Sequence, residues 1–446
     1  MSTKLVIISM DAMIGEDLPN LARHSVFSRF LESAARVRQV RSIYPTLTYP
    51  CHVTMLTGVY PDRHGVTANE AFLPGVSPLP WNFYHDAVRC RDLFDLCRAK
   101  GLTTAAVGWP VTGNHPSVDW LVDEIWTIGR EWTVETLRES LLGSGTSPEL
   151  FERAVAPHGS LRLPRRQPES SFFNINVACE ILRHYRPDVL AVHTGNFDSY
   201  RHKKGVFSDL TVRAAQESDE MLGRIVQALS DNGDADTCNI VVTSDHGQMD
   251  CTRTVHPNVL LVQHSFIDLD AGGNVTDWRA WCLSMGMSAQ LHLRDASDSV
   301  LKSELQALLE RLCQEGVWGF SRLYTAEEAR REAHLAGIEM PGKSRTGGCK
   351  PFSFVLETDN YTKFGPKWTG PYVEPAPLRL TSNRAGSHGF HPDKGPCPVF
   401  LGRGPAFKKG AQLETALLVD EAPTCAAALG LDMSGVDGRA LTELLA

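Results

Sequence analysis

The sequence predicts an α/β fold in which helices cover both faces of a doubly wound, mostly parallel β-sheet that carries an inserted α+β cap. Three observations lead to this prediction. Short runs rich in valine and isoleucine recur along the chain, helical patterns lie between them, and one long stretch interrupts the alternation. Strands that are apolar on both faces belong to parallel sheets buried between helices.

Each predicted strand ends at, or is followed by, a polar residue or a glycine. These strands cover residues 5–10, 103–109, 188–193, 239–243 and 398–402. The clearest helical patterns between them cover residues 92–100 and 210–229. Residues 419–445 are expected to add a final helix and turn that complete the core.

Residues 251–382 form the stretch that interrupts the alternation. It holds an alternating run at 288–293, a helical pattern at 299–314, and runs at 317–324 and 351–357 that flank a charged helix. We therefore expect a cap at 251–382, inserted between core segments 1–250 and 383–446. Residues 110–170 carry proline, glycine and tryptophan and are expected to form a loop-rich part of the rim.

Composition argues against several kinds of partner. The 446 residues have a net charge of −8, which offers no basic footprint for nucleic-acid backbones or acidic membranes. No apolar run approaches the ~18 residues that a membrane helix needs, and the apolar start is too short for a signal peptide. The 11 cysteines include no CxxC pair, which favours reduced thiols and a cytoplasmic location.

Three aspartates mark the ends of predicted strands. Asp11, Asp198 and Asp245 each follow an apolar run closely. In an open α/β sheet, ligands bind beyond the carboxyl ends of the strands. Together, these positions indicate a functional site at one edge of the sheet.

Thr48 begins the segment Thr48-Tyr49-Pro50, which is typical of a helix start with proline in the first turn. One explanation of Thr48 is that it only caps this helix. The other is that its hydroxyl lies in the positive potential of the helix N-terminus, where a phosphoryl group could bind.

Each remaining polar motif also has a plain explanation when taken alone. The Asp198-x-x-x-His202 spacing could be a surface pair, Asp245-His246 a capped turn and His388 an exposed loop histidine. Taken together, the motifs supply three carboxylates and three imidazoles, a mixed set that suits zinc well. A hydroxyl beside two such cations becomes a good nucleophile.

These motifs resemble those of the alkaline phosphatase superfamily, and within it the nucleotide pyrophosphatase/phosphodiesterase family. The resemblance covers most of the predicted core and is weakest over residues 110–170 and parts of the cap. The matching segments are Thr48-Tyr49-Pro50, Leu56 to Pro61, His64-Gly65, Asn69, Gly108-Trp109-Pro110, Asp198 to His202, Asp245-His246-Gly247, Gly386 to Phe390 and Gly404 to Gly410.

The resemblance implies an alkaline-phosphatase-like fold and a phosphodiesterase acting on a small phosphate ester or nucleotide through a covalent phosphothreonine-type intermediate. It implies two zinc ions per chain, with manganese or iron as alternatives. One ion would be held by Asp198, His202 and His388, and the other by Asp11, Asp245, His246 and Thr48.

Two further residues take roles from the same resemblance. Asn69 would donate a hydrogen bond to a phosphoryl oxygen in the transition state. Tyr49, which replaces a phenylalanine of the family, would flank the organic group of the substrate, either stacking on a base or forming the pocket wall.

Other functions on this platform stay open. A phosphomonoesterase or a phosphonoacetate-type carbon–phosphorus hydrolase would need a further cation, for which Arg201 and Lys203 are candidates. Tyr200-Arg201 and His391 have no assigned role. A sulfatase is disfavoured because Thr48 stands where that branch has cysteine. A phosphoglycerate mutase would use serine, and a catalytically inactive binding protein would not need the whole ligand set.

Overall fold

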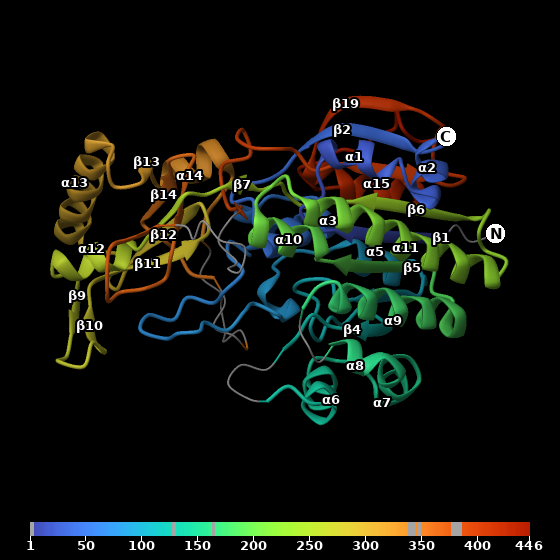
Figure 1. Ribbon diagram of the computed structural model, residues 1–446, viewed down its shortest axis with the longest axis horizontal. Helices are drawn as coiled ribbons and strands as arrows, with labels where there is room; N and C mark the ends of the chain where they lie inside the picture. Colours follow the sequence, from blue (N-terminus) through green and yellow to red (C-terminus); the bar gives the residue numbers. More distant parts are fainter. Residues whose placement is uncertain (1–3, 127–130, 163–165, 338–344, 346–348, 376–385) are drawn as a thin grey trace.

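The computed structural model describes residues 4–126, 131–162, 166–337, 345, 349–375 and 386–446. Within these residues, the centre is an eight-stranded sheet in the order β19-β2-β18-β6-β1-β5-β3-β4 (Figure 1). Its middle strands are β1 (Lys4–Met10), β5 (Val189–Thr194), β6 (Cys238–Thr243) and β3 (Thr104–Val107). These four strands run parallel and confirm four predicted strands.

The sheet also contains strands that the search for apolar runs missed. They are β2 (Ala35–Arg41), β4 (Trp120–Val122) and β19 (Gln412–Leu417). β2 and β19 mix buried with exposed residues because they lie at one edge, so neither forms an apolar run. The predicted strand β18 (Phe400–Arg403) is present but runs antiparallel to both β2 and β6.

Helices cover both faces of the central sheet, since the β1 side chains point alternately to one face and the other and are buried on both. Val6, Ile8 and Met10 pack with α2 (Ser25–Leu31), α9 (Glu169–Tyr185) and α11 (Asp209–Asp231). Leu5 and Ile7 pack on the other face with α3 (Thr48–Thr57), α5 (Leu93–Ala99) and α15 (Glu421–Ala428). Further helices of the core are α1 (Leu18–Leu21), α4 (Pro61–His64) and α10 (Asn196–Lys204).

The predicted cap region has its own antiparallel sheet, β11-β12-β14-β13. The strands are β11 (Ala280–Met285), β12 (Ser288–Leu293), β14 (Phe354–Thr358) and β13 (Phe320–Thr325). Helices α12 (Pro257–Gln263), α13 (Ser299–Glu315) and α14 (Ala326–Ala333) accompany them. Figure 1 shows this part at the end of the molecule remote from both termini.

Short strands join the cap to the core. β7 (Met249–Asp250) pairs with β17 (Gly386–Ser387) close to the two points where the predicted insertion leaves and rejoins the core. The predicted boundary at 383 lies outside the described residues, so the domain division stays a prediction. The remaining strands are β8 (Arg253–Val255), β9 (Ile267–Leu269), β10 (Val275–Trp278), β15 (Thr362–Phe364) and β16 (Val373–Pro375).

The expectation of a loop-rich rim at residues 110–170 is wrong in part. In addition to β4, the described residues form α6 (Val134–Gly143), α7 (Pro148–Leu150) and α8 (Gly159–Arg162). These helices form because Leu137, Leu141 and Leu150 are buried in the same core as α9. Figure 1 shows α6, α7 and α8 grouped beside α9.

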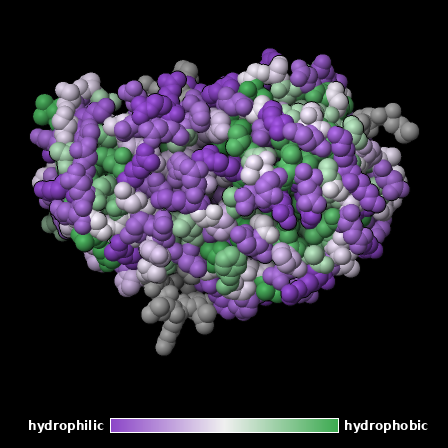
Figure 2. All heavy atoms as spheres, turned by 90° about the horizontal axis from the view of Figure 1, so that it is seen from above, coloured by the Kyte–Doolittle hydropathy of each residue, from purple (hydrophilic) through white to green (hydrophobic). Residues whose placement is uncertain are grey.

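No described helix has the length and hydrophobicity of a membrane span. On the face shown in Figure 2, hydrophobic residues are scattered among hydrophilic ones. All eleven cysteines are free thiols.

Candidate active site

Three neighbouring strand ends bring the predicted carboxylates together. β1 pairs with β5 on one side and β6 on the other, all parallel, so their carboxyl ends meet at one edge. Asp11 follows β1, Asp198 lies in the first turn of α10 after β5, and Asp245 follows β6. The backbone N–H of Asp198 donates to the Asp11 carbonyl (3.2 Å), and Ala12 N–H donates to Asp245 Oδ1 (3.1 Å).

Thr48 faces this edge from the start of α3. The N-cap is Leu47, and no side-chain capping bond is present, so Thr48 is the first helical residue and not the cap. Its Oγ1 lies 3.3 Å from His246 Nε2. His246 Nε2 lies 3.2 Å from Asp245 Oδ2 and 3.6 Å from Asp11 Oδ1. The structure therefore places the hydroxyl, one imidazole and two carboxylates together.

The second predicted group also assembles. Asp198 Oδ1 lies 3.2 Å from His202 Nε2 and 3.6 Å from His388 Nε2. The His246 and His388 rings stack with centroids 4.0 Å apart, which joins the two groups. Asp198 belongs to both sets of possible cation ligands, one with His202 and His388 and one with Asp11 and His246.

The three imidazoles are oriented alike. The Nδ1 atoms of His202, His246 and His388 lie 2.8, 3.2 and 3.0 Å from the carbonyl oxygens of Gly386, Gly247 and Thr46 respectively. A carbonyl only accepts, so each Nδ1 carries the proton, and in the neutral ring Nε2 keeps its lone pair for a cation. An imidazole bound to the backbone in this way is the usual form of a metal ligand.

The carboxylates also fit cation ligands. Within the described residues, Asp11 Oδ1 and Asp245 Oδ2 are buried without a hydrogen-bond partner. Burial and the nearby Asp245 and Asp198 raise the pKa of Asp11 well above its ordinary value, and burial raises that of Asp245 to about 6. Burial also raises the pKa of Asp198, but His202 and His388 lower it by more. Divalent cations would neutralise this crowding of negative charge.

A second layer of residues holds the site, and sequence reasoning missed it. His52 lies 2.7 Å from the Thr48 carbonyl and 2.8 Å from Ser9 Oγ. His193, the penultimate residue of β5, lies 3.1 Å from Asp11 Oδ2 and 3.2 Å from the Gly108 carbonyl. Their only sequence signal was a polar residue within or next to an apolar run.

Arg201 is also part of this layer and is fully buried. Its guanidinium donates to the Ala12 carbonyl (3.1 Å), to the Val206 carbonyl and to Asp17. Because Ala12 follows Asp11, Arg201 ties α10 to the turn after β1. It is therefore not available to bind substrate, which corrects the expectation that it is a candidate for doing so.

Tyr200, Lys203 and His391 each contact residues that are not predicted metal ligands. Tyr200 donates its hydroxyl to Glu217, and the Lys203 ammonium lies 5.9 Å from the Tyr200 ring centre. His391 packs on Tyr44 and pairs with Asp393 at 3.3 Å.

Two cavities open on the site. The larger, about 310 Å³, lies between core and cap and is lined by residues that include Asn69, Trp81, His202, Trp281 and His388. The smaller, about 210 Å³, is lined by residues that include Asp11, Thr48, Trp81, Glu124, Arg162 and His193. Trp81 lines both, so it stands where an organic group could pack.

Asn69 and Tyr49 are hydrogen-bonded to each other, but only Asn69 lines a cavity. Asn69 Oδ1 accepts the Tyr49 N–H (3.0 Å), which leaves its NH₂ group as the donor. Tyr49 is fully buried, and its ring packs edge-on against Trp81 at 5.2 Å. It lines neither cavity, so the expectation that the Tyr49 ring flanks the substrate is wrong.

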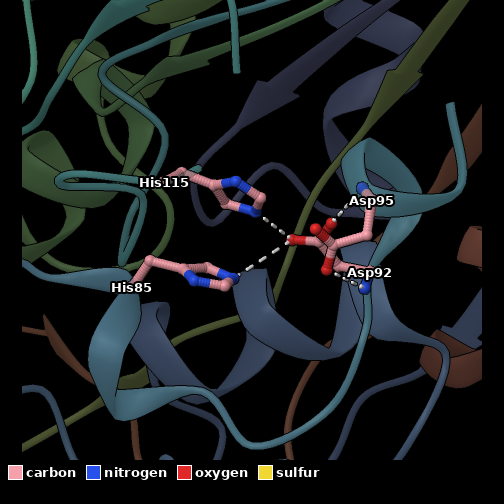
Figure 3. A group of neighbouring side chains, drawn as sticks. All are labelled: His85, Asp92, Asp95 and His115. Atoms are coloured by element: carbon pink, nitrogen blue, oxygen red, sulfur yellow. Dashed lines mark hydrogen bonds and ion pairs between the residues drawn. The ribbon is translucent and has the colours of Figure 1, made fainter. Parts of the chain in front are cut away.

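A second cluster of histidine and aspartate lies outside this site (Figure 3). It contains His85, Asp92, Asp95 and His115. His115 Nδ1 accepts the Ser117 N–H (3.0 Å), so its Nε2 carries the proton and donates to Asp92 Oδ2 (2.8 Å). A cation would need the lone pair of that nitrogen. The cluster is therefore a hydrogen-bonded support of α5, in contrast to the three imidazoles above.

Comparison with known proteins shows the family. The type I phosphodiesterase/nucleotide pyrophosphatase family model matches residues 5–390. Ectonucleotide pyrophosphatase/phosphodiesterase family member 1 of Mus musculus is 24% identical over 399 residues, covering 87% of this chain and 36% of that protein. The Mus musculus bis(5'-adenosyl)-triphosphatase is 22% identical over 446 residues, covering 96% and 78%.

A solved structure shows the same fold. Murine ectonucleotide pyrophosphatase/phosphodiesterase 5, in an inactive form with AMP, aligns over 100% of both chains with a TM-score of 0.67 and 17% identity. The chain belongs to the type I phosphodiesterase/nucleotide pyrophosphatase family and has an alkaline-phosphatase-like α/β fold. It spans about a third of the length of family member 1.

Proposed function

We propose that this protein is a two-metal phosphodiesterase that hydrolyses nucleotide-type diesters or pyrophosphates through Thr48. One observation carries the proposal. Three imidazole Nε2 atoms gather with two buried carboxylate oxygens that have no hydrogen-bond partner among the described residues, and the Thr48 hydroxyl lies 3.3 Å from one of them, His246 Nε2.

Two zinc ions fit this set of donors, with manganese or iron as alternatives. Asp198, His202 and His388 would hold one ion, and Asp11, Asp245, His246 and Thr48 the other. When bound, such ions lower the pKa of a coordinated hydroxyl and offset charge on a departing oxygen.

The residues of the chain then divide the reaction into two displacements. Thr48 Oγ1 attacks phosphorus, its bond to phosphorus forms, and the bond to the leaving oxygen breaks opposite it. Water then attacks the phosphothreonine, releasing the phosphate product and restoring the hydroxyl. The Asn69 NH₂ group donates to a phosphoryl oxygen during both steps, a contribution typically worth about 10²–10³ in rate.

The substrate class rests on the relatives. Their names give them phosphodiesterase, pyrophosphatase and bis(5'-adenosyl)-triphosphatase activities, and one was solved with AMP. The larger cavity, with Trp81 and Trp281 in its wall, suits an aromatic organic group.

We also propose a cytoplasmic location, supported by eleven free cysteines.

The variant Thr48→Ala tests the nucleophile. Its turnover of bis-p-nitrophenyl phosphate should fall by about 10³-fold or more, because no other hydroxyl takes the same place. Its metal content, measured by mass spectrometry of the purified protein, should stay near two ions per chain. Strong residual turnover would rule out the covalent mechanism.

The matched variants Asp198→Ala and His388→Ala test the ligands. Each should reduce the metal content, whereas Thr48→Ala should not. A parallel assay with p-nitrophenyl phosphate separates the alternatives, since a strong preference for this monoester would favour a phosphomonoesterase.

A further inference from the structure

Arg162 is a buried cation that has no role in the function proposed above. It is the last residue of α8, and its side chain is about nine-tenths buried, with 9% of the residue exposed. It lines the 210 Å³ cavity together with Thr48 and Asp11. Arg162 and the proposed nucleophile therefore line one small cavity.

The Arg162 guanidinium has few contacts for a buried charge. Among the described residues, no carboxylate forms an ion pair with it, and the guanidinium carbon lies 5.9 Å from the centre of the Phe173 ring. Glu124 lines the same cavity and, with Asp123, attracts the guanidinium, but burial still lowers the pKa of Arg162. A buried guanidinium normally forms charge-assisted hydrogen bonds to an anion.

The remaining charges in the cavity wall are one cation and three carboxylates. The cation, Arg166, pairs with Glu169 at 2.9 Å. Asp11 and Asp198 also line the cavity, but both are proposed cation ligands and would be neutralised. The other cations near α10 are already engaged: Arg201 is bonded to the backbone and Asp17, and Lys204 pairs with Asp209 at 3.0 Å. Of the two arginines in the cavity wall, Arg162 is thus the one without an ion pair among the described residues.

The size and position of the cavity limit what it can hold. At about 210 Å³ it is smaller than the roughly 300 Å³ at which pockets for drug-sized ligands begin. His202 and His388 would hold the ion that offsets charge on the leaving oxygen, and both line the other cavity. A small substituent that stays on phosphorus would therefore point toward Arg162.

We propose that this cavity is an anion subsite in which Arg162 binds a carboxylate or phosphate group carried by the substituent that stays on phosphorus. The inference rests on the proposed function, because it assumes that phosphorus binds beside Thr48. It names a substrate class: phosphoric or phosphonic esters whose retained group is small and negatively charged.

Three p-nitrophenyl phosphonate esters test the subsite, since they share one leaving group and differ only in the retained group. These groups are isobutyl, carboxymethyl and phosphonomethyl. The isobutyl group matches the carboxymethyl group in shape without its charge, and the phosphonomethyl group distinguishes a phosphate from a carboxylate. Bis-p-nitrophenyl phosphate is assayed alongside as a general diester.

The wild-type protein should prefer one or both charged esters over the isobutyl ester in kcat/KM. Arg162→Gln should lower kcat/KM for the preferred charged ester by about 10- to 100-fold, as expected for a lost charge-assisted hydrogen bond. The same variant should change kcat/KM for the isobutyl ester little. Arg162→Lys should restore part of the preference because it keeps the charge.

Arg138→Gln is the matched control. Arg138 lies in the same rim, and its guanidinium sits 5.6 Å from the Phe151 ring centre, yet it pairs with Glu152 outside the cavity. Melting temperatures of all variants show whether folding is intact. If Arg162→Gln does not fold, the preference of the wild type and the Arg162→Lys variant still decide the question.

Two outcomes would overturn the subsite. One is a wild-type protein that hydrolyses bis-p-nitrophenyl phosphate without preferring either charged ester. The other is a variant Arg162→Gln that loses activity equally on all three esters, as a purely structural role would cause. Failure of the wild type on every substrate, bis-p-nitrophenyl phosphate included, would instead overturn the proposed function and the subsite with it.

Discussion

At the residue scale, the backbone selects which ring nitrogen each histidine offers. His202, His246 and His388 place Nδ1 against a carbonyl oxygen, so Nε2 can only accept a proton or bind a cation. His115 places Nδ1 against an N–H group, so Nε2 can only donate. Residue type alone does not distinguish these two kinds of histidine, but one backbone contact does.

Arg201→Met should destabilise the protein because it leaves Asp17 buried without its cation. Breaking a buried ion pair costs about 3–5 kcal/mol, which chemical denaturation would measure as a loss of unfolding free energy. Arg311→Met is the control, since the exposed Arg311–Glu315 pair on α13 should contribute about 0–1 kcal/mol.

The position of Arg201 adds a second expectation. Since Arg201 binds the Ala12 carbonyl next to Asp11, the folded Arg201→Met variant should also bind metal less tightly than the control. Equal stability of the two variants would mean that the network around Arg201 has no structural role.

At the element scale, α5 depends on one carboxylate for its start. Asp92 caps this helix by accepting the Asp95 N–H (3.0 Å) and also accepts from His115 (2.8 Å). It therefore links α5 to the loop that contains Ser117. The helix predicted at 92–100 is confirmed as α5, but the sequence did not show the bond between Asp92 and His115.

Asp92→Ala should lower the unfolding free energy by about 3 kcal/mol, the sum of a helix cap and a hydrogen bond to a charged group. Asp298→Ala, which removes only the cap of α13, should cost about 1 kcal/mol. Thermal denaturation compares the two. The metal content of Asp92→Ala should stay unchanged, and loss of an ion would show that the cluster in Figure 3 binds metal after all.

At the scale of the whole molecule, acid should weaken core and cap together. His64 lies in the core beside Thr54, and His292 lies in the cap strand β12. Burial lowers the pKa of each to about 3 from an ordinary 6.5. As pH falls, the unfolded chain binds protons at these histidines before the folded protein does, so stability is lost between 6.5 and about 3.

The unfolding midpoint in urea, measured with saturating zinc across this pH range, should therefore fall steadily. His64→Gln should make the fall of the midpoint with pH less steep, because it removes one of these two histidines. A slope that is the same in the variant and the wild type would show that His64 does not stay neutral in the folded protein.

Strand ends and motif order made part of the site readable from the sequence. Asp11, Asp198 and Asp245 could be placed near one another because parallel strands end at one sheet edge. β2 and β19 were not predicted because half of their side chains face solvent, so neither strand forms an apolar run. The helices α6 to α8 were not predicted because the Pro and Gly residues between them are typical of loops.

The sequence by itself determined the family, the parallel sheet and the residue types of the site, since these follow from periodicity and from short motifs. Only the tertiary structure decided that Tyr49 is buried, that Arg201 holds the backbone and that Arg162 lines a cavity with Thr48. The physical reason is that burial and charge pairing depend on segments far apart in the chain. Arg162 and Thr48 are brought to one cavity by packing that no local pattern encodes.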